Sequence, residues 1–157
     1  MSTLVRKFKK QDAIKVSNVI KKSFRSIISK NYTKESVEDQ IKENSPKKIL
    51  EKASKVKYFV AVENGKILGF GGYSREKIHT FFVLPEMQGK GIGSKILKEV
   101  LSEAKTEGIK SIKCWSTFNA ENFYSSFGFK KRKKLNLKTK NSSISFLVIS
   151  TDIKNLL

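Results

Sequence analysis

Apolar and polar residues recur along this chain with two different periods, and each period predicts one kind of element. Residues 4–9 alternate apolar and basic side chains, which predicts a short strand. From Asp12 onward, apolar residues recur every three or four positions, which predicts a long amphipathic helix that ends near Lys30. Its apolar positions are Ile14, Val16, Val19, Ile20, Phe24, Ile27 and Ile28. Two shorter helices should follow, because Thr33 and the pair Ser45-Pro46 carry N-cap signatures.

A β-hairpin is predicted next. Two apolar runs, residues 57–63 and 66–74, flank the dipeptide Asn64-Gly65. Both central residues of a type I′ turn need positive φ, and this dipeptide supplies them readily. The second run contains Gly69, Gly71 and Gly72. Because glycine inside a strand indicates a close approach, we expect another backbone or a substrate to lie against this strand.

The middle of the chain predicts a βαβ unit. Residues 76–83 form an apolar strand that leads into a loop with three glycines, at 89, 91 and 93. A helix with one apolar stripe follows, Gly108 stands where a left-handed C-terminal residue belongs, and residues 109–115 have the pattern of a buried strand. The stripe consists of Ile92, Ile96, Leu97, Val100, Leu101 and Ala104. The two strands should be parallel neighbours joined by a right-handed crossover.

The glycine-rich loop is a candidate phosphate site. Glycines keep side chains away from consecutive backbone N–H groups, and these groups lie at the positive end of the following helix. The spacing fits neither the G-x-x-x-x-G-K-[ST] loop nor the G-x-G-x-x-G loop of common nucleotide sites. A pyrophosphate cradle of another kind is therefore indicated.

The last third of the chain predicts a short helix and a closing hairpin. Within residues 119–129, Phe123 and Phe127 stand four positions apart and should face the core, and Gly128 should end the helix. Residues 135–138 and 144–151 alternate apolar and polar positions, which fits an antiparallel pair. No linker or repeat interrupts these elements. We therefore expect residues 1–157 to form a single domain that mixes helices and strands, of α/β (α+β) class.

The charge balance indicates anionic partners. Lys and Arg number 33 against 14 Asp and Glu, which leaves a formal charge of +19. Such a field attracts polyphosphate cofactors, nucleic acids and acidic membranes alike. The basic run 130–134 follows Phe127 and Phe129, so binding of single-stranded nucleic acid is one alternative. The other is a solvated lysine-rich surface, because lysine is scattered over every predicted element.

The rare residues exclude several classes of site. Cys114 is the single cysteine and His79 the single histidine, so neither a disulfide within the chain nor a Cys or His cluster for a metal is expected. The first ten residues lack the apolar core of a signal peptide, and no run approaches the length of a membrane span. We expect a cytoplasmic protein with no membrane partner.

Two local motifs resemble those of the GNAT superfamily of acetyl-CoA-dependent N-acetyltransferases. The segment Gln88-Gly-Lys-Gly-Ile-Gly93 matches the cofactor motif Q/R-x-x-G-x-G/A of that family and follows Val83-Leu-Pro-Glu at the usual distance. The segment Ala120-x-x-Phe123-Tyr124-x-x-x-Gly128-Phe129 matches its second cofactor-side motif. The resemblance covers about the whole chain and is weakest over residues 12–55. It implies a mixed, mostly antiparallel central sheet with a central parallel βαβ unit, flanking helices, and two splayed strands.

This resemblance implies how acetyl-CoA is held. Backbone amides from Gln88 to Ser94 would bind the pyrophosphate, with Lys90 adding charge nearby. The strand edge at Phe82 and Val83 would pair with the pantetheine amides. The cofactor-binding residues implied are Phe82, Val83, Gln88, Gly89, Lys90, Gly91, Ile92, Gly93, Ser94, Asn119 and Asn122.

The resemblance also implies catalytic roles. Tyr124 corresponds to the general acid of the family, a phenol near the thioester sulfur. Many members carry a glutamate base where this chain has Lys77, so that base is missing. His79 matches a catalytic histidine of the arylalkylamine acetyltransferase branch, and its ordinary pKa suits removal of a proton from an ammonium. A water chain to bulk solvent and Glu76 are the alternatives for the base.

Together these features predict an N-acetyltransferase that transfers acetyl from acetyl-CoA to a primary amine, of a small molecule or a protein, in a ternary complex. A non-catalytic acyl-CoA sensor is the alternative within the same fold, and a basic nucleic-acid-binding protein is the third possibility. The chain should act as a monomer or homodimer. The identity of the acceptor is not encoded in any motif.

Overall fold

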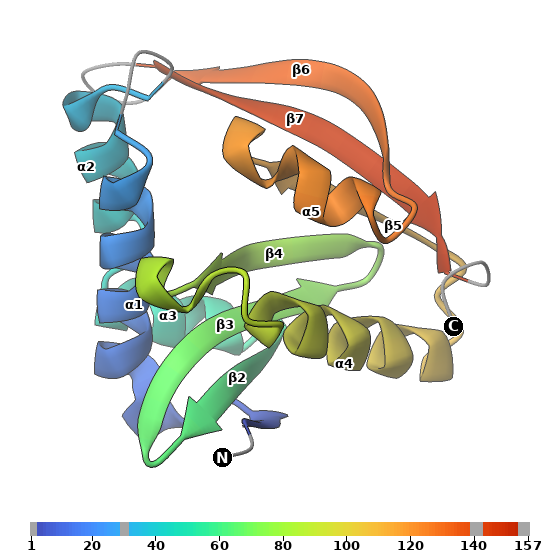
Figure 1. Cartoon of the computed structure of the whole chain (residues 1–157), viewed down its shortest axis with the longest axis horizontal. Helices are drawn as coiled ribbons and strands as arrows, with labels where there is room; N and C mark the ends of the chain where they lie inside the picture. Colours follow the sequence, from blue (N-terminus) through green and yellow to red (C-terminus); the bar gives the residue numbers. More distant parts are fainter. Residues whose placement is uncertain (1–2, 29–31, 139–142, 154–157) are drawn as a thin grey trace.

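A seven-stranded sheet forms the centre of the molecule, in the strand order β1-β2-β3-β4-β5-β7-β6 (Figure 1). The computed structural model describes residues 3–28, 32–138 and 143–153. The strands are β1 Leu4–Lys7, β2 Lys57–Glu63, β3 Lys66–Ser74, β4 Lys77–Val83, β5 Ser111–Ser116, β6 Lys130–Lys138 and β7 Ser143–Asp152. Neighbouring strands are antiparallel except β4 and β5, which are parallel. The predicted mixed sheet with one parallel pair is therefore confirmed.

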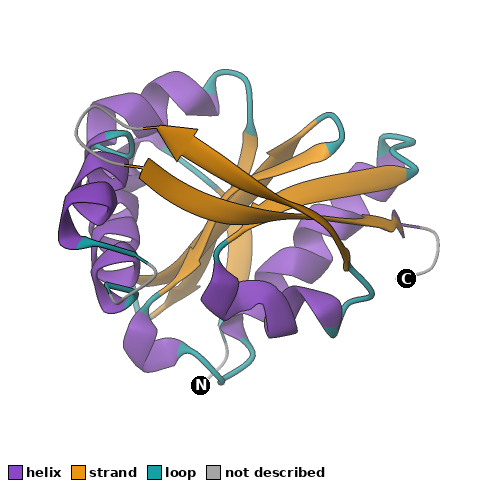
Figure 2. Ribbon diagram, turned by 90° about the horizontal axis from the view of Figure 1, so that it is seen from above, coloured by secondary structure: helices purple, strands orange, loops and turns teal. Residues whose placement is uncertain are grey.

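Helices pack on both faces of this sheet, and Figure 2 shows them gathered on two sides of the strands. They are α1 Ala13–Ser26, α2 Lys34–Lys42, α3 Pro46–Ala53, α4 Ile92–Thr106 and α5 Glu121–Ser125, with short 3-10 turns η1 Lys10–Asp12, η2 Pro85–Met87 and η3 Phe118–Ala120. Helix α1 contacts β3 and β4, and α2 and α3 pack against α1. Helix α4 contacts β2 and β3. Side chains alternate along β3, so Phe70 faces Phe8 and Tyr58 while Gly69 and Gly71 face Ile96 of α4.

The local signals in the sequence are confirmed where they depend on backbone chemistry. The Thr33 hydroxyl accepts from the Ser36 amide, and the Ser45 hydroxyl accepts from the Lys48 amide. Asn64 and Gly65 both have positive φ, 52° and 75°, as a type I′ turn requires. These caps and turns are satisfied within a few residues of the chain, so they need no tertiary contact to form.

Several sequence predictions are corrected by packing. Helix α1 ends at Ser26, earlier than predicted, and Lys30 lies outside the described residues. Ile14 and Ile28 do not join the core, because their side chains are 67% and 40% exposed. Strand β5 alternates buried and exposed positions instead of being buried throughout, and Trp115 is 39% exposed. The turn of the closing hairpin, residues 139–142, also lies outside the described residues.

A β-bulge in β4 explains the glycines of β3. Phe70 pairs with Phe82 and Gly72 pairs with His79, so the two β4 residues in between face Gly71 alone. A Cβ on Gly71 would lie 2.4 Å from Cδ2 of Phe81, and a Cβ on Gly69 would lie 2.7 Å from Cδ1 of Ile96. At Gly72 a Cβ would lie 2.5 Å from the Lys57 carbonyl oxygen, so the predicted close approach of another backbone is confirmed there, whereas at Gly69 and Gly71 the nearest atoms belong to core side chains.

Strand β5 leaves β4 soon after the two meet. Their parallel pairing consists of Lys77 with Lys113 and Ile78 with Cys114, at the start of β4. The bulge follows immediately in β4, and a bulge bends its strand and ends regular pairing. The second half of β4 therefore has an edge free of β5, and the splay implied by the family resemblance is confirmed.

The basic run lies on the sheet's outer edge. Strand β6 pairs with β7 and begins at Lys130, earlier than the predicted hairpin, and residues 130–134 are all exposed. Phe129 is buried, and Phe127 packs against Phe123 with ring centroids 5.6 Å apart. Phe129 is therefore part of the core, and Phe127 is partly buried against it. Lysine on an edge strand hinders pairing with a second sheet.

Replacing Gly71 by alanine is expected to destabilise the protein by about 2 kcal/mol, because the new methyl group overlaps the Phe81 ring. Urea denaturation of the wild type, Gly71→Ala, Phe81→Leu and the double variant forms a cycle that isolates this contact. The alanine should cost at least about 1 kcal/mol less beside leucine than beside phenylalanine. Equal costs in the two backgrounds would mean that Gly71 is needed for a reason other than the ring.

Candidate active site

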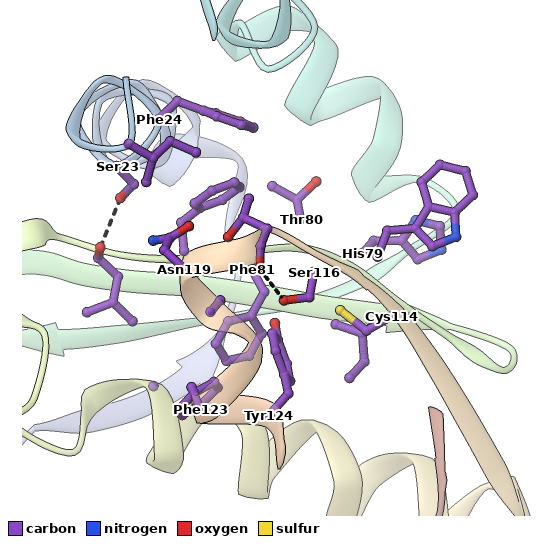
Figure 3. A pocket seen from close by; sticks show the side chains of 18 of the residues that line it. Ser23, Phe24, His79, Thr80, Phe81, Cys114, Ser116, Asn119, Phe123 and Tyr124 are labelled. Atoms are coloured by element: carbon purple, nitrogen blue, oxygen red, sulfur yellow. Dashed lines mark hydrogen bonds between the residues drawn. The ribbon is translucent and has the colours of Figure 1, made fainter. Parts of the chain in front are cut away.

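A cavity of about 690 Å³ opens where β5 diverges from β4. Its walls come from β4, the start of α4, the end of β5, α5, and the layer formed by α1, α2 and α3 (Figure 3). Most of the residues singled out by the sequence line this one cavity. They are His79, Phe82, Val83, Gln88, Gly89, Gly91, Gly93, Ser94, Asn119 and Tyr124.

At the glycine end of the cavity, residues 88–94, the Gln88 amide donates to the Pro85 carbonyl, and the amides from Gly89 to Ser94 have no backbone partner among the described residues. Gly89 and Gly91 adopt the left-handed conformation, with φ of 78° and 83°. Gly91 is the N-cap of α4 and has no side chain with which to cap it. The first helical bond runs from the Lys95 amide to the Gly91 carbonyl, so the preceding amides of the first turn lack an intrahelical partner. This arrangement attracts an anion, because the amides and the helix dipole act at the same point.

Helix α1 is fixed to the end of β4 through Ser23. The Ser23 hydroxyl donates to the Val83 carbonyl at 2.9 Å, and Gln88 Nε2 donates to the same oxygen at 3.3 Å (Figure 3). The rings of Phe24 and Phe82 lie beside this bond, with centroids 4.7 Å apart. Ser23 is a cavity residue that the sequence analysis missed. Its signal was a hydroxyl on the apolar stripe of an amphipathic helix.

Tyr124 is buried at the centre of the cavity wall. Its ring contacts Phe81, Phe123 and Phe129, with centroids 5.1 to 6.0 Å apart. Tyr124 therefore packs the short helix against the core, a task that the sequence assigned to Phe123 and Phe127 alone. Burial, together with the neighbouring Cys114 thiol, raises the pKa of Tyr124 well above its ordinary value. The phenol is consequently protonated at neutral pH.

Cys114 lies beside Tyr124 in the same wall (Figure 3). Burial raises the pKa of the Cys114 thiol to about 12. Since the thiolate is the nucleophilic form, this cysteine is unreactive at neutral pH and behaves as a small apolar side chain.

His79 is half-buried and neutral. Its Nε2 lies 2.7 Å from the Ser74 hydroxyl oxygen. Burial lowers the pKa of His79, and the positive charges of Lys77 and Lys52 lower it further. The imidazole therefore remains in the form that accepts a proton, although as a weaker base than a solvated histidine.

The other end of the cavity contains two lysines, and we call it the lysine end. It consists of the lining residues Glu43, Asn44, Lys52, Lys77 and His79. Lys52 Nζ donates to the Glu43 carbonyl at 2.9 Å and to Asn44 Oδ1 at 3.1 Å. Lys77 Nζ lies 3.4 Å from the centroid of the Trp115 ring. Burial is the main reason that the pKa of each lysine is lowered.

Four sequence candidates have side chains outside the cavity lining. Lys90 is exposed beside the glycine loop, and the Ile92 side chain is buried in the core. Asn122 is exposed on α5, where its carbonyl accepts from the Ser126 amide. Glu76 is exposed before β4, which leaves His79 as the base candidate within the cavity.

Sequence comparison identifies the family of this fold. The model of the acetyltransferase (GNAT) domain matches residues 18–150. The chain belongs to the GNAT acetyltransferase family. An uncharacterized N-acetyltransferase of Methanocaldococcus jannaschii is 30% identical over 48% of this chain, and another of Archaeoglobus fulgidus is 36% identical over 36%. The matched segments span only 40% and 43% of those two relatives.

Solved GNAT structures share the whole fold. A GCN5-related N-acetyltransferase of Rhodopseudomonas palustris has a TM-score of 0.89 at 16% identity, covering 97% of this chain and 96% of that one. The PaiA N-acetyltransferase of Thermoplasma acidophilum, crystallised in complex with coenzyme A, has a TM-score of 0.79 at 20% identity, covering 97% and 99%. At these identities the likeness concerns the fold.

Across residues 3–28, 32–138 and 143–153, no helix is long and apolar enough to cross a membrane. The same residues contain no group of three or more His, Cys, Asp and Glu side chains arranged to hold a metal ion.

His79 is expected to titrate with a midpoint below its ordinary value of about 6.5. As the single histidine, it gives one set of imidazole C–H resonances, which an NMR titration can follow without assignment. Lys52→Met and Lys77→Met should each move the midpoint upward, because each removes a positive charge that disfavours the imidazolium. Lys47→Met, an exposed position on α3 outside the cavity, is the matched control. A wild-type midpoint at or above 6.5 would contradict the burial described for this ring.

Proposed function

We propose that this protein acetylates a primary amine with acetyl-CoA by direct transfer in a ternary complex. The observation that carries the proposal is that a single cavity joins the uncapped start of α4 to a protonated phenol and a neutral imidazole. Acetyl transfer needs a neutral amine, a polarised carbonyl and a proton for the departing thiolate. We further infer that residues 1–157 act as one domain, because one hydrophobic core contains both sides of the cavity.

The glycine end suits the pyrophosphate of coenzyme A. Backbone amides between Gln88 and Ser94 would hold it, since their hydrogen-bond capacity is unused in the first turn of α4. The free edge of β4 at Phe82 and Val83 suits the extended, amide-rich pantetheine arm. Asn119 lines the same channel from the other wall. The coenzyme A complex of the PaiA neighbour supports this assignment, as does the net charge of +19, which favours encounter with an anionic donor.

Tyr124 would act as the general acid. Its phenol is protonated at neutral pH, so it has the proton that the departing thiolate requires. A thiol normally has a pKa near 8.5, below that of a phenol, which would make the transfer unfavourable in water. The neighbouring Cys114 shows that burial at this wall raises the pKa of a thiol to about 12. The same burial raises the pKa of Tyr124, so the phenol keeps its proton until a thiolate forms beside it.

His79 would take the proton from the attacking amine. It is neutral, lines the cavity and is held by the Ser74 hydroxyl. Burial raises the pKa of Cys114 to about 12, which disfavours its thiolate as a carrier of the acetyl group and supports direct attack of the amine on the thioester.

Gly91→Lys is expected to weaken acetyl-CoA binding at least about tenfold, even though it adds a positive charge. A side chain at φ of 83° forces the loop to shift and shields the amides of the first turn. Gly65→Lys is the matched control, because Gly65 has a similar φ of 75° and open surroundings, yet lies in the β2–β3 turn. Calorimetry should find weaker binding only in the first variant. Equal affinity in both would remove the glycine end as the donor site.

Tyr124→Phe is expected to lower kcat about a hundredfold while the KM for acetyl-CoA changes little, because it removes a proton donor and keeps the ring. Tyr73→Phe serves as the control. Tyr73 is also buried, but it lies outside the cavity lining, and its hydroxyl donates to Glu107, the C-cap residue of α4. Full activity of the Tyr124 variant would eliminate the acid role. Comparable loss in the control would point to a general packing defect.

A further inference from the structure

We infer that the acceptor is a small primary amine that also carries an anionic group, a carboxylate or a phosphate, which binds at the lysine end of the cavity. The inference rests on the proposed acetyl transfer for its reaction and on the lysine end for its specificity. The lysine end includes His79 from the start of β4, whereas the glycine loop follows the end of β4, and residues of both line the one cavity.

Lys52 is held ready for an anion. Its ammonium group has three donors, and two of them are used by the Glu43 carbonyl and by Asn44 Oδ1. Asn44 is itself buried and fixed, because its amide group donates to the Gln40 carbonyl at 2.9 Å and its own carbonyl accepts from the Ser17 hydroxyl at 2.8 Å. This network orients the Lys52 side chain before a ligand arrives, so little side-chain entropy is lost on binding.

Lys77 approaches the same space from the sheet. Its ammonium rests on the Trp115 ring, and the side chain is half-buried. A cation on an aromatic face keeps its N–H groups available on the side away from the ring. Burial lowers the pKa of this lysine and of Lys52, which means that both charges are incompletely solvated. A bound anion would give each ammonium group electrostatic stabilisation in place of the water that burial removes.

The fields of the two lysines meet at His79. Both charges lower the pKa of this imidazole, so both act at the centre of the lysine end. Among the described lining residues Glu43 is the acidic one, and its carboxylate partly offsets the charge of Lys52, whereas no acidic residue among them offsets Lys77. The positive potential at the centre therefore favours an anion and opposes a second ammonium group.

This arrangement defines the shape of the acceptor. Lys52, Lys77 and His79 line one cavity with Cys114 and Tyr124, so an acceptor whose anionic group contacts the lysines would have its amine in the same cavity as the proposed acid and base. Amino acids and phosphorylated amines have this combination of charges. Diamines do not, because their second ammonium would lie between two lysines.

Matched acceptors test the inference with the full chain. Turnover is measured as thiol released from acetyl-CoA with β-alanine against β-alaninamide, O-phosphoethanolamine against ethanolamine, and a diamine of similar length. The anionic member of at least one pair should have a kcat/KM at least about tenfold higher than its partner. The carboxylate pair and the phosphate pair separate the two sources of anion. Equal or higher kcat/KM for the members that lack the anionic group, or for the diamine, would overturn the inference.

Charge-removal variants connect the preference to the lysine end. Lys52→Met and Lys77→Met keep an apolar stem of similar length and should each reduce the anionic-to-neutral ratio of kcat/KM about tenfold. Lys47→Met should leave the ratio unchanged. Thermal unfolding with and without coenzyme A supplies a reading that needs no turnover, because a ligand that binds the native state raises Tm. In the wild type, the preferred anionic acceptor should raise Tm more than its partner without the anionic group. In Lys52→Met, the two Tm shifts should be equal.

Different results would contradict the proposed acetyl transfer and the anionic acceptor. Absence of coenzyme A binding and of turnover with every amine would sink the proposed acetyl transfer, and the thermal shifts would still decide whether the lysine end binds an anion. Turnover restricted to neutral amines, with no Tm difference between acid and amide, would leave the acetyltransferase intact and overturn the anionic acceptor.

Discussion

The packing of Phe81 over Gly71 is the contact on which the cavity depends. It accompanies a bulge that gives β4 two residues opposite one on β3, directly after the two pairs that join β4 to β5. Without the bulge, β4 and β5 would continue side by side, because parallel neighbours normally pair along their length. This interruption leaves one edge of β4 free of β5. It also opens the cavity between the two strands, which Tyr124 lines.

The two ends of the cavity are both positive, but for different physical reasons. At the glycine end the charge is partial and belongs to backbone amides and the dipole of α4, so it is fixed by the fold. At the lysine end it belongs to whole ammonium groups, whose pKa values are lowered because burial and their neighbours disfavour them. The uncharged phenol of Tyr124 and the uncharged imidazole of His79 line the same cavity. A proton donor and a proton acceptor therefore share one cavity with the two positive regions.

The remaining positive charge has a different effect. Strand β6 forms one edge of the sheet and exposes five consecutive basic residues, Lys130–Lys134. Their mutual repulsion opposes edge-to-edge association of two copies. The neighbouring Phe127 and Phe129 pack inward, which separates the cationic edge from the aromatic core. The charges on β6 therefore hinder association at the edge of the sheet, whereas Lys52 and Lys77 line the cavity.

The sequence by itself determined the features that are satisfied locally or by periodicity: the caps at Thr33 and Ser45, the Asn64-Gly65 turn, the buried stripe of α4 and the glycine loop before it. Its motifs also selected ten residues that line one cavity. Only the tertiary structure decided the bulge at Phe81, the bond from Ser23 to Val83, the burial of Tyr124 and the convergence of Lys52 and Lys77 on His79. These features depend on contacts between different elements, the longest of which joins residues 60 positions apart, and the period of a single element does not record which neighbour it will face.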